Sequence, residues 1–87
     1  MSADVTVLYF AALRERMGRS RDILTLSENT RTVGALLMER RKVDPTLDAA
    51  LSGPGTLRVA VNRQLSDLSA PVQAGDEVAV FPPMTGG

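Results

Sequence analysis

The stretch that decides the fold is Gly75-Asp76-Glu77-Val78-Ala79-Val80-Phe81-Pro82-Pro83, close to the C-terminal end of the sequence. Its Gly-Asp pair predicts a turn, and the apolar residues that follow predict a short strand from Glu77 to Phe81. Pro82 and Pro83 fix φ and withhold amide donors, so we expect the strand to end sharply at Phe81. The sequence therefore predicts a last strand that leads directly into the chain end.

Three further strands are expected upstream, where β-branched and apolar residues gather. We interpret residues 4–10 as a strand buried on both faces, because both alternating sets of side chains are largely apolar. Residues 22–27 predict a second short strand that could pair with the first. Residues 57–62 predict another, in which Leu, Val and Val alternate with Arg, Ala and Asn. Residues 65–72 contain a proline and are interpreted as a loop.

Helix signals lie between these strands. Residues 11–17 are good helix formers that stop at Gly18, which predicts a helical turn capped by glycine. Residues 32–42 predict the main helix, with the first threonine as N-cap and apolar residues at helical spacing. Gly34 inside it indicates either an irregular first turn or a neighbouring element that packs closely. Asp-Pro at the start of residues 44–51 predicts a further short helix.

This order of elements predicts an α+β fold in which one mixed sheet packs on the main helix. The β-grasp, or ubiquitin-like, topology matches it best, and other small α+β folds share the same pattern. The length of 87 residues suits a single domain. Hydrophobic residues make up 44% of the chain against 23% charged, which excludes a wholly disordered protein. We expect a β-grasp domain over residues 1–81 and a free, flexible tail over residues 82–87.

The charge pattern argues against nucleic acid and membranes as partners. Ten basic and ten acidic residues cancel, so no net field attracts a polyanion. One Tyr and two Phe are too few for the stacking platforms of single-strand binders. Basic clusters occur at residues 14–21 and 40–42, and we interpret them as solvated surface or as a docking patch for an acidic protein.

Free-standing catalysis is not expected, because the sequence contains no Cys and no His. It has neither a thiolate nucleophile nor a His general base, and no thiolate metal site. Asp76 and Glu77 are neighbours at a strand start and cannot easily share a substrate. The longest apolar run, residues 7–13, is far short of the ~20 residues that span a bilayer, so a soluble cytoplasmic protein is expected.

The most informative feature for function is the ending Thr85-Gly86-Gly87. Two glycines remove every side chain beside the terminal carboxylate, so the chain end can thread a narrow channel in a partner. At ~3.6 Å per residue, the residues after Phe81 reach up to roughly 22 Å. The carboxylate must be activated before it reacts, and the sequence has no phosphate-binding loop, so the ATP chemistry belongs to a partner. A frayed terminus is the alternative interpretation.

Motifs along nearly the whole chain are typical of one known family: Val7-Leu8-Tyr9-Phe10-Ala11, Arg14-Glu15, Gly18, Ala60-Val61-Asn62, Leu65, Gly75-Asp76-Glu77-Val78, Phe81-Pro82-Pro83 and Gly86-Gly87. By these motifs the chain resembles the small, MoaD-type subunits of molybdopterin synthase, within the ubiquitin-like sulfur carriers. The ending is the most specific of them. Two residues depart from the pattern of that family: Met84 stands where a small or β-branched residue is usual, and Val80 where an aromatic residue can occur. Neither departure affects the terminal glycine.

The resemblance implies that Gly87 is the reacting residue, with Gly86 beside it. An adenylating enzyme of the ubiquitin-activating type would use ATP to form an acyl-adenylate, and a sulfur donor would turn it into a thiocarboxylate. The tail would then enter the large synthase subunit and give its sulfur to cyclic pyranopterin monophosphate, which builds the dithiolene of molybdopterin. The chain itself would bind no cofactor and no metal, and would act as a non-catalytic sulfur-donating subunit.

The same resemblance implies a docking patch for these partners at Phe10, Leu65 and Phe81. Core packing is the other interpretation of Phe10 and Leu65. Rival functions are a sulfur carrier for thiamine, cysteine or tRNA thiolation, a ubiquitin-like modifier that conjugates to lysines, and a non-covalent interaction module. The stem that would also contact the partner consists of Pro82, Pro83, Met84 and Thr85.

Overall fold

The computed structural model describes residues 3–52 and 56–84. The elements in chain order are β1 (Asp4–Tyr9), α1 (Ala12–Met17), β2 (Arg21–Thr25), α2 (Val33–Val43), α3 (Pro45–Leu51), β3 (Thr56–Val61), β4 (Gln64–Ser66) and β5 (Glu77–Met84). Within these residues the strands form a five-stranded sheet in the order β2-β1-β5-β3-β4. β1 and β5 are parallel, and the other neighbouring strands are antiparallel. The expected α+β fold with one mixed sheet is confirmed.

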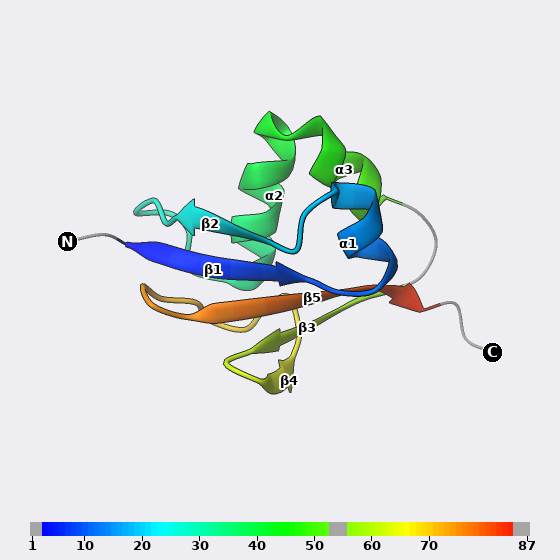
Figure 1. Ribbon diagram of the computed structural model, residues 1–87. Coiled ribbons are helices and arrows are strands. Elements are labelled where there is room, and N and C mark those ends of the chain that lie inside the picture. The colour runs from blue at the N-terminus through cyan, green and yellow to red at the C-terminus, as the bar shows by residue number, and fades with distance from the viewer. Residues whose placement is uncertain (1–2, 53–55, 85–87) are drawn as a thin grey trace.

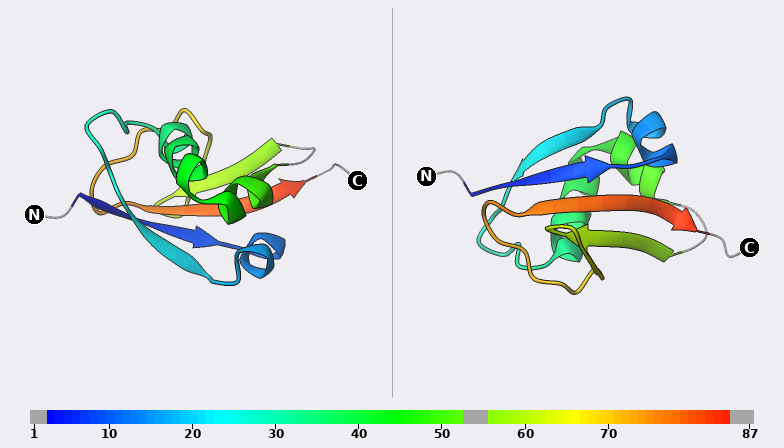
Figure 2. Two further views of the ribbon diagram at one scale, coloured as in Figure 1. Left: turned by 90° about the horizontal axis from the view of Figure 1, so that it is seen from above. Right: turned by 60° about the horizontal axis from the view of Figure 1, so that its bottom comes forward.

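The described helices cover one face of this sheet. Figure 1 shows α1, α2 and α3 above the strands, and the right view of Figure 2 shows the strands in front with the helices behind them. The core lies between the helices and the sheet face that they cover. Its buried residues are Val5, Val7, Tyr9, Leu13, Met17, Leu24, Val33, Leu36, Leu37, Leu47, Ala50, Leu51, Val59, Val72, Val78 and Val80.

The burial of β1 differs from the sequence expectation. Val5, Val7 and Tyr9 are buried, but Thr6 and Leu8 are only half-buried. The prediction of a strand buried on both faces is therefore wrong. Successive side chains of a strand point to opposite faces, and the described helices pack on only one of them.

The ends of the helices follow the local signals in the sequence. Gly18 ends α1 in the left-handed conformation, with φ of 73°. Thr32 caps α2, because its hydroxyl oxygen accepts a hydrogen bond from the amide of Ala35 at 3.1 Å. Asp44 caps α3 in the same way, accepting from the amide of Leu47 at 3.2 Å. All three helical predictions are confirmed, since each cap satisfies a backbone group that the helix end leaves without a partner.

Gly34 lies where the loop before β5 crosses the first turn of α2. Its amide donates to the carbonyl oxygen of Leu68 at 2.8 Å. A β-carbon at this position would stand 3.0 Å from that same oxygen and 3.3 Å from Cβ of Leu68. Of the two explanations offered for this glycine, the close packing of a neighbouring element is the correct one.

Residues 65–72 were expected to be loop, and this prediction is wrong for residues 65 and 66, which belong to β4. The strand pairs with β3 through Ala60 opposite Leu65 and forms one edge of the sheet. The hairpin loop between them is Asn62-Arg63, with φ of 50° and 70°. Positive φ at both loop positions is typical of a type I′ turn, whose usual signal is Asn-Gly. An arginine at the second position and a short, largely polar edge strand concealed the hairpin in the sequence.

The expected end of the last strand at Phe81 is also wrong, because β5 runs to Met84. The backbone amide and carbonyl groups of even-numbered β5 residues point towards β1. The last hydrogen bond between the two strands is donated by the amide of Phe10 to the carbonyl of Val80 at 3.2 Å. Pro82 is the next residue facing that side, where β1 has already ended, so its missing amide costs the ladder nothing. On the side of β5 that pairs with β3, the register of the pairing shifts between Thr56 and Arg58.

The predicted boundary between domain and tail therefore moves towards the chain end. Pro82, Pro83 and Met84 belong to β5, not to a flexible tail. Residues 85–87 lie outside the described residues, and so does the part of the tail prediction that concerns them. β5 thus extends three residues beyond Phe81, where the two prolines predicted that it would end.

Candidate functional site

Apolar residues lie side by side across the sheet face that the described helices leave uncovered. Leu8 pairs with Ala79, Ala79 with Ala60, and Ala60 with Leu65, so one row crosses four strands. Residues directly opposite each other in neighbouring strands project from the same face. Ala60 and Ala79 are small and buried, whereas the Leu65 side chain beside them projects outwards with 74% of its surface exposed.

Two aromatic rings continue this row towards the end of β5. Phe10 lies two residues after Leu8, and Phe81 lies two residues after Ala79, so both rings project from the same face as the row. Their rings stack with centroids 5.0 Å apart and planes inclined by 15°. Phe10 is 41% exposed and Phe81 is half-buried. We name the set of Leu8, Phe10, Ala60, Leu65, Ala79 and Phe81 the sheet patch.

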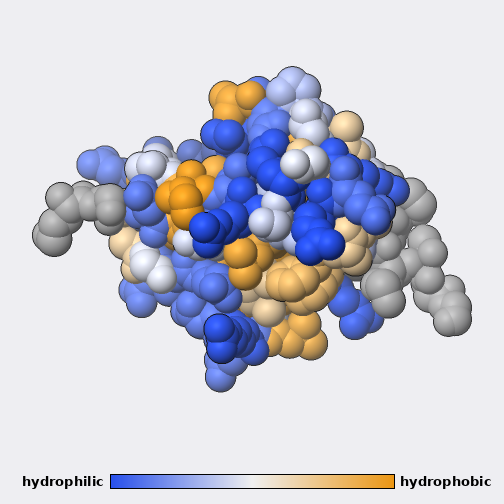
Figure 3. Space-filling view, viewed as in Figure 1, coloured by the Kyte–Doolittle hydropathy of each residue, from blue (hydrophilic) through white to orange (hydrophobic). Residues whose placement is uncertain are grey.

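The core interpretation of Phe10 and Leu65 is therefore wrong. Both are exposed large apolar residues. Figure 3 shows orange and pale orange atoms gathered below the centre of the molecule, over the lower strands, with blue atoms around them. A contiguous exposed apolar area with a polar border is typical of a surface that binds another protein. The binding role of these residues stays a prediction.

The turn after Phe10 fixes the position of this ring. Ala11 has φ of 51° and ψ of −129°, a conformation that residues with a side chain rarely adopt. The carbonyl of Phe10 accepts a hydrogen bond from the amide of Leu13 at 3.1 Å, so α1 begins immediately. The chain thus leaves the sheet directly after Phe10, which places its ring beside that of Phe81.

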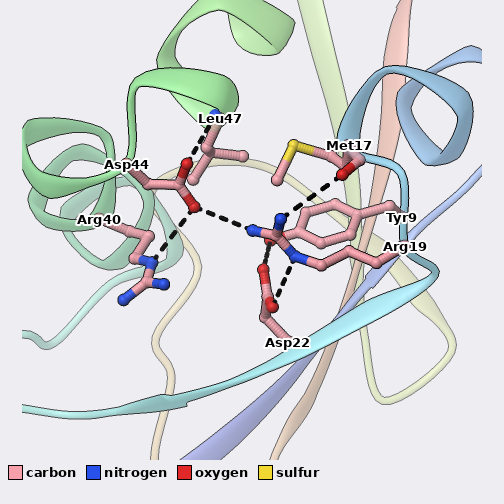
Figure 4. Close-up of polar contacts among 7 residues, drawn as sticks. All are labelled: Tyr9, Met17, Arg19, Asp22, Arg40, Asp44 and Leu47. Carbon is pink, nitrogen blue, oxygen red and sulfur yellow. Dashed lines mark hydrogen bonds and ion pairs between the residues drawn. The ribbon is translucent and has the colours of Figure 1, made fainter.

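A network of polar side chains holds the residue before Phe10 from the helix side (Figure 4). The hydroxyl of Tyr9 donates to Oδ2 of Asp22 at 2.7 Å. Arg19 donates from Nε to Oδ1 of Asp22 at 2.8 Å, and from Nη2 to Oδ2 of Asp44 at 2.9 Å. The network joins β1 and β2 to the junction of α2 and α3, and so anchors the strand end that presents Phe10.

The pKa values of this network follow from burial and hydrogen bonding. Burial, and the hydrogen bond that it donates to Asp22, raise the pKa of the Tyr9 hydroxyl far above its ordinary value. Burial alone would raise the pKa of Asp22, but hydrogen bonds from Arg19 and Tyr9 outweigh it and hold that pKa below the usual value. The amide of Leu47, followed by Arg19, lowers the pKa of Asp44. Both carboxylates are therefore ionised at neutral pH.

Sequence reasoning missed this network. Arg19 was grouped with a basic cluster at residues 14–21, interpreted as solvated surface or docking patch. The structure shows that its guanidinium is instead bound between Asp22 and Asp44. The only local signal was the spacing of three residues between Arg19 and Asp22, because Asp44 is distant in the sequence.

The end of β5 brings the stem of the tail close to the sheet patch. Pro82 follows Phe81 directly and is half-buried. Pro83 and Met84 continue the strand, with Met84 paired to Thr56. Figure 1 shows β5 ending on the same side of the molecule as α1, which follows Phe10. The predicted reacting residue Gly87, with Gly86 and Thr85, lies outside the described residues.

Residues 3–52 and 56–84 contain neither a cluster of metal ligands nor a membrane-spanning helix. The described residues contain no group of three or more His, Cys, Asp or Glu side chains able to hold a metal ion. No helix among them is long and apolar enough to cross a membrane. The candidate site consists of the sheet patch and the adjoining end of β5.

A five-stranded β-grasp sheet, helices on one face and an apolar patch on the other define a ubiquitin-like protein. Residues 7–87 match the ThiS family, and the chain belongs to that family. The family match thus includes the Gly-Gly ending that the structure does not describe.

Two curated relatives and a solved structure are similar over nearly the full length. The molybdopterin synthase sulfur carrier subunit of Escherichia coli is 39% identical over 83 residues, which cover 95% of this chain and 99% of the relative. The protein with the same name from Haemophilus influenzae is 37% identical over the same shares. The crystal structure of SAMP1 from Haloferax volcanii has a TM-score of 0.77 at 28% identity, covering 97% of this chain and 99% of that one. The resemblance found in the sequence motifs is confirmed.

Proposed function

We propose that this chain is the sulfur carrier of a molybdopterin synthase and that Gly87 carries the sulfur as a thiocarboxylate. The observation that supports this most strongly is the similarity to two such carriers over 95% of the chain, in a family match that runs to Gly87. The chain contributes a carboxylate and a docking surface, while its partners perform the catalysis.

The proposed chemistry uses the terminal carboxylate alone. A carboxylate oxygen of Gly87 attacks the α-phosphorus of ATP on an activating enzyme of the ubiquitin-activating type, and pyrophosphate leaves. The terminal sulfur of a persulfide on the donor then attacks the acyl carbon and AMP leaves, which gives an acyl disulfide. A second thiol of the donor reduces this disulfide, which releases the thiocarboxylate and leaves a disulfide on the donor. Because the sequence has no Cys and no His, no side chain of this protein can hold a persulfide or relay protons as those residues do. ATP is accordingly used by the partner, and we propose that the carrier binds no cofactor of its own.

The second proposed step is delivery to the large synthase subunit. The sheet patch would dock on that subunit through Phe10, Leu65 and Phe81, and the stem from Pro82 to Thr85 would lead the glycines into its active site. The stem gains direction from β5, because the strand holds the backbone in the sheet as far as Met84. There the thiocarboxylate would give its sulfur to cyclic pyranopterin monophosphate. We place these steps in the cytoplasm, where ATP is available to the activating enzyme.

The test is the intact mass of the protein after incubation with an activating enzyme, ATP and a sulfur donor. We expect a gain equal to one exchange of oxygen for sulfur, located in the C-terminal peptide and absent without ATP. One residue added after Gly87 should abolish the gain, because the carboxylate becomes an amide. Lys42→Ala is the matched control and should leave it unchanged. Sulfur that maps elsewhere, or an unchanged mass with several competent activating enzymes, would contradict the proposal.

A second candidate is a ubiquitin-like modifier, favoured by the similarity to SAMP1, whose name appears in another solved structure as small archaeal modifier protein 1. The two functions share activation and differ in the acceptor. A modifier forms ATP-dependent amide conjugates with lysines of other proteins, whereas a carrier returns to its starting mass once the large subunit has taken its sulfur. Adding the large subunit and cyclic pyranopterin monophosphate to the thiocarboxylate form distinguishes them. Loss of sulfur in that reaction also excludes carriers dedicated to thiamine, cysteine or tRNA.

A further inference from the structure

Arginines border the sheet patch on two sides. Arg21 lies opposite Leu8 in the pairing of β2 with β1, and Arg58 lies opposite Phe81 in the pairing of β3 with β5. Both therefore project from the same face as the patch, Arg21 from β2 beyond Leu8, and Arg58 from β3 beside Phe81 on the side away from β1. Both side chains are exposed. An apolar area is thus flanked by two positive charges that the fold, not the sequence, places there.

These guanidinium groups are available for an outside partner. The ion pairs among the described residues engage Arg19, Arg40 and Arg41, and none of them includes Arg21 or Arg58. Two carboxylates lie near this face: Glu77 pairs with Thr6 nearer the start of β1, and Asp67 follows Ser66, which lies opposite Val59. The Asp67 carboxylate accepts hydrogen bonds from the amide and hydroxyl of Ser69. Along β5, Glu77 and Phe81 are four residues apart, roughly 13 Å at strand spacing.

A depression beside the patch adds a third arginine. It lies between β1, β2 and the start of α1, with Leu8 and Phe10 on its apolar side and Arg14 and Arg21 on its basic side. Side chains able to pair with a carboxylate are therefore adjacent to side chains able to contact an apolar group. The depression is continuous with the sheet patch because Leu8 and Phe10 belong to both.

We propose that the protein partner which docks on the sheet patch carries carboxylates on both sides of an apolar contact, and that these carboxylates pair with Arg21 and Arg58. This inference rests on the proposed function, since the partner in question is the large synthase subunit. The planar guanidinium group matches a carboxylate through two parallel hydrogen bonds, which fixes orientation as well as attracting charge. The arginines set the rate and register of docking, and the Phe10–Phe81 pair sets the residence time.

The chemistry of the face favours an acidic protein over the other occupants. A nucleic acid needs a continuous basic track, whereas here apolar side chains separate Arg21 from Arg58. A second copy of this chain would bring its own arginines to the same face and would offer few carboxylates in return. Opposite charges at the border of an interface act mainly on the association rate, and this effect weakens as salt is added.

The experiment measures association with the large subunit of a molybdopterin synthase by stopped-flow fluorescence. It compares about 50 mM with about 500 mM NaCl, because the Debye length shortens roughly threefold between these concentrations. The test variant is Arg21→Glu with Arg58→Glu. The matched control, Arg31→Glu with Lys42→Glu, makes the same change in net charge at exposed positions outside the strands. We expect the test variant to associate about tenfold more slowly at low salt and to lose most of its salt dependence. The control should change the rate by less than about twofold.

Equal effects of the two double variants would overturn the inference and leave the proposed function intact. Failure of the wild-type protein to bind the large subunit would instead overturn both. A slower association seen only in the test variant, with an unchanged dissociation rate, supports the inference. Arg21→Gln with Arg58→Gln provides a second variant without reversed charge, and circular dichroism checks that each variant is folded. Self-association that the test variant abolishes, detected by sedimentation, would assign the arginines to a second copy and overturn the inference.

Discussion

The ring of Phe10 stacks on the ring of Phe81 at 5.0 Å, although the two residues come from opposite ends of the sequence. The parallel pairing of β1 with β5 brings them together, and the turn at Ala11 keeps Phe10 on the uncovered face. The pair lies directly before the strand segment that leads to the chain end. The proposed docking patch and the stem of the tail are therefore adjacent along β5.

Phe81→Ala should weaken binding to the partner by about 2 kcal/mol or more, as is typical of aromatic residues at the centre of interfaces. The free energy of unfolding should fall by less, since Phe81 is half-buried and lies outside the core cluster. Calorimetric titration gives the affinity, and denaturant unfolding gives the stability. Leu68→Ala, at an exposed residue outside the patch, is the control. A variant that unfolds before it loses affinity would show that the ring serves the fold.

Gly34→Ala should destabilise the protein by about 1–3 kcal/mol, the usual cost of overpacking. Alanine is the better helix former by about 1 kcal/mol, but its β-carbon would stand 3.0 Å from the carbonyl oxygen of Leu68. That oxygen cannot move away without stretching its hydrogen bond from the Gly34 amide. Urea unfolding measures the change, with Ala49→Gly on the exposed side of α3 as a propensity control. A more stable Gly34→Ala variant would refute the close contact.

Asp22→Asn should lower stability at neutral pH and lose its effect in acid. The pKa of Asp22 is depressed in the folded state, because hydrogen bonds from Arg19 and Tyr9 outweigh its burial. A depressed carboxyl pKa contributes stability that is fully present above the unfolded value of about 4 and is lost as the pH falls through the folded value. The difference in unfolding free energy between wild type and variant should therefore be constant from about pH 5 to 8 and shrink below about pH 4. A difference that does not depend on pH would count against the ionised network.

Removal of Gly86 and Gly87 should leave the melting temperature nearly unchanged while abolishing the gain of sulfur. Glycines have no side chain and so bury almost no apolar area on folding. Scanning calorimetry compares the truncated and full-length chains. A melting temperature several degrees lower in the truncated chain would indicate that the terminus packs against the domain.

The sequence by itself determined the features that depend on neighbours along the chain. Gly18, Thr32 and Asp44 fix the helix ends because each cap acts within one turn of its own helix. The Gly-Gly ending is equally local, since a small chain end beside a free carboxylate is a property of those residues alone. Together with the order of the predicted elements, these signals were enough for an α+β fold, and the motifs were enough for the resemblance to the carrier family.

The tertiary structure decided everything that depends on which strand pairs with which. Leu65 belongs to an edge strand because β3 supplies its partners, and β5 passes through Pro82 because β1 has already ended there. Phe10 is exposed although its sequence environment is as apolar as that of Tyr9, since the helices pack on only one face. Burial and pairing arise from contacts between distant segments, and a local pattern specifies alternation but not which alternate face will be covered.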